Sequence, residues 1–340
     1  MSDPILSRLS PEASIVLVRL RSLGDTVLVT PAFSLLRRAM PRASIHVAME
    51  ERFADVLARQ PDIDGVVRLA TGAGTLGKAR LLRDLRALQP SLCLDMHGGT
   101  TAAWCTALSG ARWRAGFAHF RQRWAYNVRI PRPQEVLGRE EDESVHTAEH
   151  HAAAVMHLAG TLEPIPSARL AAAPPDADQP YAILHAGATY ATKTWQLSHF
   201  RALADRLRKR YGLEPVFVAG PEEADLAAKL TDFQVRQGLP LSDLMSLLAG
   251  ARLFVGNDSG PAHIAAAFDV PCVTIFGSSN SKIWHPWKTR HRVVETDWDC
   301  KPCPGDRCYA FDEPRCILSV TPEAVAQAVD ELLAEGQVAS

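Results

Sequence analysis

The chain has 340 residues, of which 47% are hydrophobic and 22% charged, and its formal net charge at pH 7 is −1. This length predicts two domains, and the composition is that of a soluble globular enzyme. The near-neutral charge excludes a dedicated nucleic-acid binder, no hydrophobic run is long enough to span a bilayer, and the first residues lack the pattern of a signal peptide. We therefore expect a cytoplasmic protein without a nucleic-acid partner.

The chain alternates predicted strands and helices in both halves. In the first half, strands are expected at 15–20, 44–48, 66–69 and 92–95, with helices at 26–39, 53–60, 76–88 and 146–158. In the second half, strands are expected at 181–185, 215–219, 253–255 and 272–276, with helices at 197–210, 222–230, 241–249, 262–268 and from Thr321. This alternation predicts parallel sheets with crossover helices, joined by a Pro- and Ala-rich linker at 164–180.

The turn after the first strand carries a candidate general base. It holds one glycine, Gly24, and no Gly-x-Gly-x-x-Gly pattern, which argues against a nicotinamide or flavin site. Asp25 stands at the carboxyl edge of the strand, where open α/β sheets bind their ligands. A carboxylate there can take a proton from a hydroxyl nucleophile. The alternative is that Asp25 only caps the next helix, through the N–H groups of Thr26 and Val27.

The segment 96–134 is basic and aromatic. It contains no Asp or Glu but six arginines, including Arg112 and Arg114, and six aromatic residues lie among them. Such a segment suits a phosphorylated glycolipid acceptor and a membrane surface, and the alternative is a solvated basic face around packed aromatic rings. His97 follows the strand 92–95, which places it at the ligand-binding edge.

The segment 253–268 gives the clearest signal in the chain. A short hydrophobic strand leads into a tight turn from Gly256 to Gly260, and Pro261 stands where a helix should begin. The start of a helix offers backbone N–H groups and a positive dipole to an anion, above all to a phosphate. Asp258 and His263 flank this spot and can contact a sugar or a second phosphate.

Two other strand ends in the second half carry polar residues. The loop after 181–185 contains hydroxyl groups, including that of Thr189, and Lys193, which can neutralise a phosphate or be an ordinary exposed lysine. Glu222 and Glu223 follow the strand 215–219 and can bind ribose hydroxyls, although glutamate also suits the first turn of a helix.

A late cluster of cysteines leaves several interpretations open. Cys300, Cys303, Cys308 and Cys316 can supply four thiolates to a structural metal, but their spacing is shorter than that of a zinc ribbon. We favour free thiols packed in a loop over a structural metal or a labile disulfide, and we assign no catalytic metal.

Taken in order and at these separations, the motifs resemble those of the ADP-heptose:lipopolysaccharide heptosyltransferases. The resemblance runs from residue 15 to about residue 333 and is carried by 18–28, 94–99, 112–117, 185–195, 256–263 and the stretch ending in Cys316. It implies the α/β fold called GT-B, with two Rossmann-like, doubly wound domains facing each other across a cleft. Residues 1–170 would bind the acceptor and 171–340 the nucleotide sugar, and the C-terminal helix could pack back on the first domain.

The resemblance also implies roles for individual residues. Asp25 would be the general base of an inverting transfer without metal or cofactor, in which the ADP-sugar is a co-substrate. The donor's diphosphate and sugar would be bound by a set of polar residues, namely Thr189, Lys193, Asp258, Ser259, Gly260 and His263. Leu239 and Glu222 or Glu223 would contact the nucleoside, while His97, Arg112 and Arg114 would contact the acceptor.

The expected partners are ADP-heptose and the glycolipid of the lipopolysaccharide core, reached at the cytoplasmic face of the inner membrane. Alternatives are a related transferase with another sugar or acceptor, a sugar-nucleotide epimerase of the same fold, and a non-catalytic nucleotide-sugar sensor. An epimerase would need further acids and bases near the anomeric centre, where only Asp25 and Asp258 are clearly placed. The sequence leaves open the acceptor hydroxyl and the oligomeric state.

Overall fold

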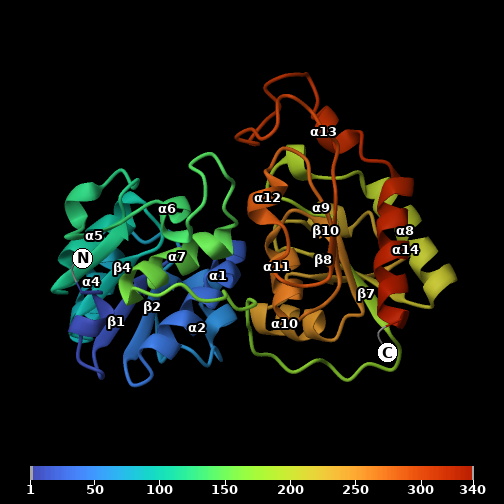
Figure 1. The fold of residues 1–340 in the computed structure, drawn as a ribbon. Helices are drawn as coiled ribbons and strands as arrows, with labels where there is room; N and C mark the ends of the chain where they lie inside the picture. The colour runs from blue at the N-terminus through green and yellow to red at the C-terminus, as the bar shows by residue number, and fades with distance from the viewer. Residues whose placement is uncertain (1–2, 339–340) are drawn as a thin grey trace. The chain divides into compact units, whose positions relative to one another are not determined.

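The computed structural model describes residues 3–338 and divides between Ala171 and Ala172 into two compact units. Each unit contains one six-stranded sheet in which all paired strands are parallel, with helices on its faces (Figure 1). The α/β class expected from the sequence is therefore confirmed.

The first unit is built on the strands β1 Ser14–Val18, β2 Ser44–Glu50, β3 Gly65–Leu69, β4 Leu92–Asp95, β5 Trp113–Phe117 and β6 Val128–Ile130. Its α-helices are α1 Leu23–Leu28, α2 Thr30–Ala39, α3 Glu51–Ala54, α4 Thr75–Ala87, α5 Thr100–Leu108, α6 Pro133–Leu137 and α7 Thr147–Ala159, and short 3-10 turns lie at Leu6–Arg8, Asp55–Leu57 and Arg123–Ala125. The strand order is β3-β2-β1-β4-β5-β6.

The second unit repeats this topology with the strands β7 Tyr181–His185, β8 Glu214–Ala219, β9 Gln234–Gln237, β10 Leu253–Asn257, β11 Cys272–Ile275 and β12 His291–Val294. Its helices are η4 Ala191–Lys193, a 3-10 turn, and α8 Leu197–Tyr211, α9 Ala224–Ala227, α10 Leu241–Ala249, α11 Gly260–Ala267, α12 Ser281–Trp284, α13 Arg315–Leu318 and α14 Pro322–Val338. The order β9-β8-β7-β10-β11-β12 is the same doubly wound order as in the first unit.

Helices cover both faces of the second sheet. Figure 1 shows α10, α11 and α12 on one face and α8 and α14 on the other. The C-terminal helix α14 contacts α8, β11 and β12, all within its own unit. The hydrophobic core of this unit is formed by α8 and α14 against the strands, with the fully buried rings of Trp195, Phe200 and Phe217 among its largest members.

The predicted helix 26–39 is two helices. α1 ends at Leu28, and α2 begins at Thr30 with Pro31 in its first turn. Proline has no N–H to donate and favours the start of a helix, so the chain restarts there. The predicted helix 222–230 is reduced to α9, and β5, β6, β9 and β12 were not predicted, because their short segments lack a clear hydrophobic alternation.

In both units the strand order reverses at a central pair, which is β1 with β4 in the first and β7 with β10 in the second. Chain segments leave these two strands in opposite directions, so a crevice opens at their carboxyl ends, where open α/β sheets bind ligands. The two units therefore each offer one position for a ligand.

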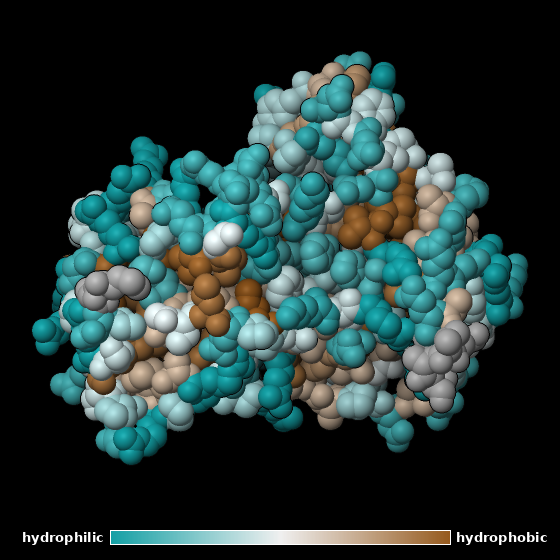
Figure 2. All heavy atoms as spheres, in the orientation of Figure 1, coloured by the Kyte–Doolittle hydropathy of each residue, from teal (hydrophilic) through white to brown (hydrophobic). Residues whose placement is uncertain are grey.

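None of the helices among the described residues is both long and hydrophobic enough to cross a membrane. Figure 2 shows hydrophilic residues over much of the viewed face, with hydrophobic residues in small separate areas.

Close packing at the end of β10 predicts that a larger residue at position 256 destabilises the protein. A Cβ on Gly256 would lie 2.8 Å from the ring of Phe254 and 3.0 Å from the carbonyl oxygen of His185. We expect Gly256→Ala to lower the free energy of unfolding by about 1–3 kcal/mol, because the neighbouring strand must shift. Urea unfolding measures this, and Gly220→Ala is the control, since its Cβ would meet nothing closer than 3.5 Å. Equal stabilities of the two variants would contradict the prediction.

Candidate functional site

At the carboxyl edge of the first sheet, Asp25 lies in the first turn of α1 with both carboxylate oxygens engaged. Oδ2 accepts hydrogen bonds from the backbone N–H of Ser22 at 3.2 Å and from its hydroxyl at 2.9 Å, and Oδ1 pairs with Arg19. Asp25 thus caps α1, but through Ser22 and not through Thr26 and Val27. A carboxylate has about four acceptor positions, so these three contacts leave room for one ligand hydroxyl.

Arg19 lies between two carboxylates at the point where β1 and β4 separate. Its guanidinium pairs with Asp25 and donates to the carbonyl of Met96 at 2.8 Å. Burial lowers the pKa of Arg19, while Asp25 and Asp95 act in the opposite direction. Asp95 is itself buried, which raises its pKa, and it accepts hydrogen bonds from the N–H groups of His97 and Gly98 and from the Tyr126 hydroxyl at 2.7–2.9 Å.

His97 lines a pocket of about 500 Å³ at this edge. Burial, and secondarily the nearby charges of Arg19 and Arg21, lower the pKa of His97 to about 4, so the ring is neutral at pH 7. The pocket also contains two cations, Arg21 and Lys78, and one acid, Glu50. A pocket of this charge suits an anionic sugar.

Arg21, Glu50 and Lys78 are pocket residues that the sequence analysis missed. Two of them had a usable signal, because Arg21 comes directly after the first predicted strand and Glu50 just after the second. Lys78 in the first turn of α4 had none, since nothing in the sequence indicates which face of α4 meets the pocket.

Arg112 and Arg114, which were expected to contact the acceptor as His97 does, lie at the opposite edge of the sheet from His97. They stand at the amino end of β5, where Trp113 and Arg114 pair with Leu92 and Cys93 at the start of β4. His97 follows the carboxyl end of β4, which is the opposite edge of the sheet. The Arg114 guanidinium is engaged with the carbonyls of Ala111 and Ala125 at 3.2–3.4 Å.

At the carboxyl edge of the second sheet, Lys193 and Asp258 form an ion pair. The Lys193 Nζ lies 2.9 Å from the Oδ2 of Asp258, and the Ser279 hydroxyl donates to the same oxygen at 2.6 Å. The side chains of Lys193 and Asp258 are 24% and 8% exposed. Lys193 is therefore not an ordinary exposed loop lysine but a positive charge held beside the end of β10.

The helix α11 begins immediately after this ion pair. Ser259 is its N-cap residue, Gly260 and Pro261 open its first turn, and His263 is buried in that turn at 4% exposure. Backbone N–H groups and the positive end of the helix dipole therefore lie next to Lys193. Thr189 lies exposed in the loop after β7.

Asn257 is a further residue of this edge, which the sequence analysis did not single out. Its buried amide donates to the carbonyls of Ala186 at 2.9 Å and Gly187 at 3.3 Å and accepts from the N–H of Trp195 at 3.0 Å. These bonds tie the end of β10 to the loop that carries Lys193. A polar side chain ending a hydrophobic strand is the signal that could have identified it.

The three predicted nucleoside contacts also lie at this edge, after β8 and β9. Glu223 is half-buried, and its Oε2 accepts from the N–H of Gly220 at 2.6 Å and lies 3.9 Å from the Nε2 of His185. Glu222 is exposed, and Leu239 is half-buried in the loop between β9 and α10.

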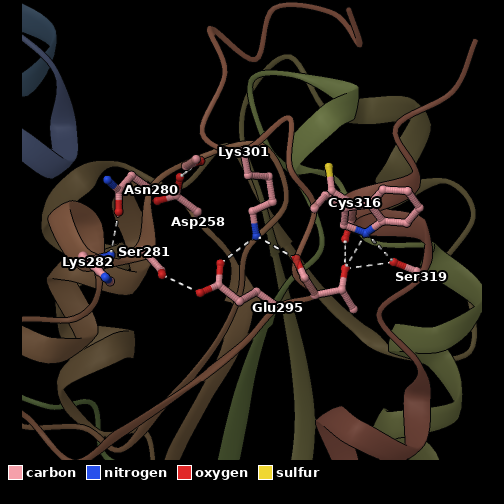
Figure 3. Close-up of polar contacts among 11 residues, drawn as sticks. Asp258, Asn280, Ser281, Lys282, Glu295, Lys301, Cys316 and Ser319 are labelled. Atoms are coloured by element: carbon pink, nitrogen blue, oxygen red, sulfur yellow. Dashed lines mark hydrogen bonds and ion pairs between the residues drawn. The ribbon is translucent and has the colours of Figure 1, made fainter. Parts of the chain in front are cut away.

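The cysteine-rich segment packs beside the same edge. All four cysteines are free thiols, and among the described residues no group of three or more His, Cys, Asp or Glu side chains is arranged to hold a metal ion. The N–H of Cys303 donates to the carbonyl of Ser278, and Thr192 donates to the carbonyl of Gly305. Figure 3 shows the ion pair of Lys301 with Glu295, at 2.7 Å, that anchors the segment.

The low pKa of His97 predicts how stability changes with pH. An unfolded histidine titrates near 6.5, so between pH 6.5 and about 4 the unfolded chain binds more protons than the folded one, and stability falls as the pH falls. We expect His97→Gln to lose less stability than the unaltered protein between ~pH 7 and ~pH 4.5 in urea unfolding. An NMR titration midpoint of the His97 ring near its ordinary value would contradict this.

Comparison with known proteins identifies the family. Residues 78–310 match the model of glycosyltransferase family 9, described as heptosyltransferases. The chain is 28% identical to lipopolysaccharide heptosyltransferase 1 of Pseudomonas aeruginosa, over 94% of this chain and 98% of that protein. It is also 28% identical to a lipopolysaccharide heptosyltransferase 3 of Escherichia coli, over 91% of this chain and 96% of the other.

Solved structures of heptosyltransferases confirm the GT-B fold expected from the sequence. A family 9 glycosyltransferase of Veillonella parvula superposes with a TM-score of 0.82 at 21% identity, covering 95% of this chain and 98% of that one. The Escherichia coli heptosyltransferase WaaC, solved with ADP, gives a TM-score of 0.75 at 21% identity, covering 94% and 99%. The match to the family model covers more than half of the chain, and we conclude that the chain belongs to glycosyltransferase family 9, the heptosyltransferases.

Proposed function

We propose that this family 9 glycosyltransferase transfers heptose from ADP-heptose to the inner core of lipopolysaccharide, with inversion at the anomeric carbon and without a metal ion. The names of the relatives support the reaction, and WaaC has been solved with ADP and with ADP-2-deoxy-2-fluoro heptose. The observation that carries the proposal is the pairing of Lys193 with Asp258 at the start of α11.

The donor's leaving group explains why positive charge is needed at this edge. As the bond between the anomeric carbon and the phosphate oxygen breaks, its electron pair leaves with ADP. Lys193, His263 and the N-terminus of α11 would stabilise that negative charge in the absence of a divalent ion. In this proposal Thr189, Ser259 and Gly260 contact the diphosphate or the sugar.

The nucleoside would be bound on the other side of β7. Leu239 offers a hydrophobic contact to the base, and Glu222 or Glu223 can accept hydrogen bonds from the ribose. Glu223 already accepts from Gly220, whereas the carboxylate of Glu222 is exposed at the same edge.

The acceptor would be bound in the pocket beside Asp25. The hydroxyl of the acceptor sugar gives its proton to the Asp25 carboxylate while its oxygen forms the new bond to the anomeric carbon. Arg21, Lys78 and His97 line the pocket and suit the negatively charged sugars of a lipopolysaccharide core. Arg19 and Ser22 hold the carboxylate in place.

Replacement of the base tests the proposal. We expect Asp25→Asn to reduce transfer from ADP-heptose to a Kdo–lipid A acceptor by about 100-fold or more, while ADP-heptose binding is unchanged. The matched control is Ser22→Ala, which removes a contact to the carboxylate but keeps the base and should retain most of the turnover.

Three results would contradict the proposal in different ways. Full turnover of Asp25→Asn would exclude Asp25 as the base. ADP release without a glycoside product would indicate the epimerase. Activity only with another nucleotide sugar would exclude ADP-heptose as the donor.

The acceptor is a lipid, so we also propose a peripheral contact with the cytoplasmic face of the inner membrane. Trp104 on α5 and Trp124 are 51% and 55% exposed, and their ring centroids are 4.6 Å apart. Leu108, one turn further along α5, is 38% exposed. Tryptophan favours the membrane interface, and the neighbouring arginines, with no acid in 96–134, suit anionic lipids.

Vesicle binding tests the membrane contact. We expect the double variants Trp104→Ser/Trp124→Ser and Arg121→Glu/Arg123→Glu each to weaken binding to phosphatidylglycerol vesicles by about 10-fold or more. Leu76→Ser, on the 88% exposed Leu76 of α4, is the control and should bind as the unaltered protein does. Unchanged binding after the arginine reversal would refute this surface.

A further inference from the structure

A buried histidine connects two of the proposed donor contacts. His185 ends β7, is 8% exposed, and lies between Ser259 at the start of α11 and Glu223 after β8. Its Nδ1 is 2.9 Å from the Ser259 hydroxyl oxygen, and its Nε2 is 3.9 Å from the Oε2 of Glu223. The histidine therefore contacts the serine with one ring nitrogen and faces the carboxylate with the other.

The position of Glu223 is fixed from two sides. Its Oε2 accepts the N–H of Gly220 at 2.6 Å, and its Oε1 would lie 1.9 Å from a Cβ on Gly187. Only a glycine at 187 leaves space for the carboxylate, so Gly187 and Gly220 together keep a negative charge beside His185.

That charge decides which nitrogen of His185 carries the proton. Burial lowers the pKa of His185 more than Glu223 raises it, so the ring is neutral near pH 7 and has one N–H. A carboxylate beside Nε2 favours the tautomer with the proton on Nε2, because the alternative would place a lone pair against a negative charge. Nδ1 is then an acceptor, and the 2.9 Å contact requires Ser259 to donate its hydroxyl proton to it.

We propose that His185 and Glu223 make the Ser259 hydroxyl a hydrogen-bond acceptor, so that Ser259 recognises a hydroxyl of the transferred sugar and not the diphosphate. The inference rests on the proposed function. The oxygens of a diphosphate only accept hydrogen bonds, and a serine whose proton is held by His185 has none to offer them. A sugar hydroxyl can donate to the lone pairs that Ser259 keeps.

The strand order indicates which sugar this is. The proposed nucleoside contacts follow β8 and β9, on one side of β7, whereas Ser259 follows β10 on the other side. Lys193, the proposed diphosphate contact, lies in the loop after β7 and pairs with Asp258 at the end of β10. A donor that places its nucleoside at β8 and β9 and its diphosphate at Lys193 brings its transferred sugar, not its ribose, to β10.

Binding of ADP and of ADP-heptose by calorimetry, without acceptor, separates the two roles of Ser259. We expect Ser259→Ala to weaken ADP-heptose binding about 5-fold and leave ADP binding unchanged, the size of one hydrogen bond. Ser259→Thr, which keeps the hydroxyl, should restore ADP-heptose binding. Lys193→Met should weaken both ligands. Equal weakening of both by Ser259→Ala, or no effect on either, would overturn the inference.

Two further measurements test His185 and Glu223. We expect Glu223→Gln to reduce the preference for ADP-heptose over ADP in the same direction as Ser259→Ala, while Asp225→Asn, which removes an exposed charge from α9, leaves it unchanged. The ¹⁵N chemical shifts of His185, assigned by comparison with His185→Gln, should be those of the Nε2–H tautomer. The Nδ1–H tautomer, or an unchanged preference in Glu223→Gln, would overturn the inference. Failure of the unaltered protein to bind either ligand would contradict the proposed function instead.

Discussion

The parallel pairing of β7 with β10 is the constraint on which the proposed donor contacts depend. The strand order reverses at this pair, and the chain leaves the two strands in opposite directions. A crevice therefore opens at their carboxyl ends. Asn257 secures this arrangement, because its buried amide bonds the end of β10 to the loop after β7 and to Trp195. Lys193 stands in that loop, and so the backbone of the two strands brings it close to Asp258.

A second constraint, shared by both units, is that each proposed catalytic charge is held by a partner of opposite charge. Asp25 pairs with Arg19, and Lys193 pairs with Asp258, in each case directly after the central strand pair. Removing one member of a partly buried pair leaves the other charge without its partner. The pairs therefore position the charges, and a ligand that approaches Lys193 or Asp25 must use the acceptor and donor positions that the pairs leave open.

Much of this edge could be predicted from the sequence, because the signals were local. The strand–turn–helix pattern around Gly256 to His263 and the position of Asp25 after the first strand required only short-range periodicity and turn chemistry. The sequence misplaced residues whose position at one or the other edge of the sheet depends on how the strands pair. Arg112 and Arg114 were expected at the acceptor from the basic composition of 96–134 and from the family resemblance, but β5 begins at Trp113, so the pairing of β5 with β4 places them at the edge opposite His97. Arg21 and Lys78 meet only in the folded pocket.

The cysteine-rich segment shows most clearly what sequence spacing omits. Its cysteines invite a metal or disulfide interpretation, yet the contacts that tie it to the carboxyl edge of the second sheet come from its backbone and from Lys301. Gly305 and Cys303 bond to Thr192 and Ser278, and these are the neighbours of Lys193 and of Ser279, which bonds to Asp258. The ion pair of Lys301 with Glu295 holds the segment against them. These contacts depend on main-chain geometry, which no pattern of cysteines can reveal.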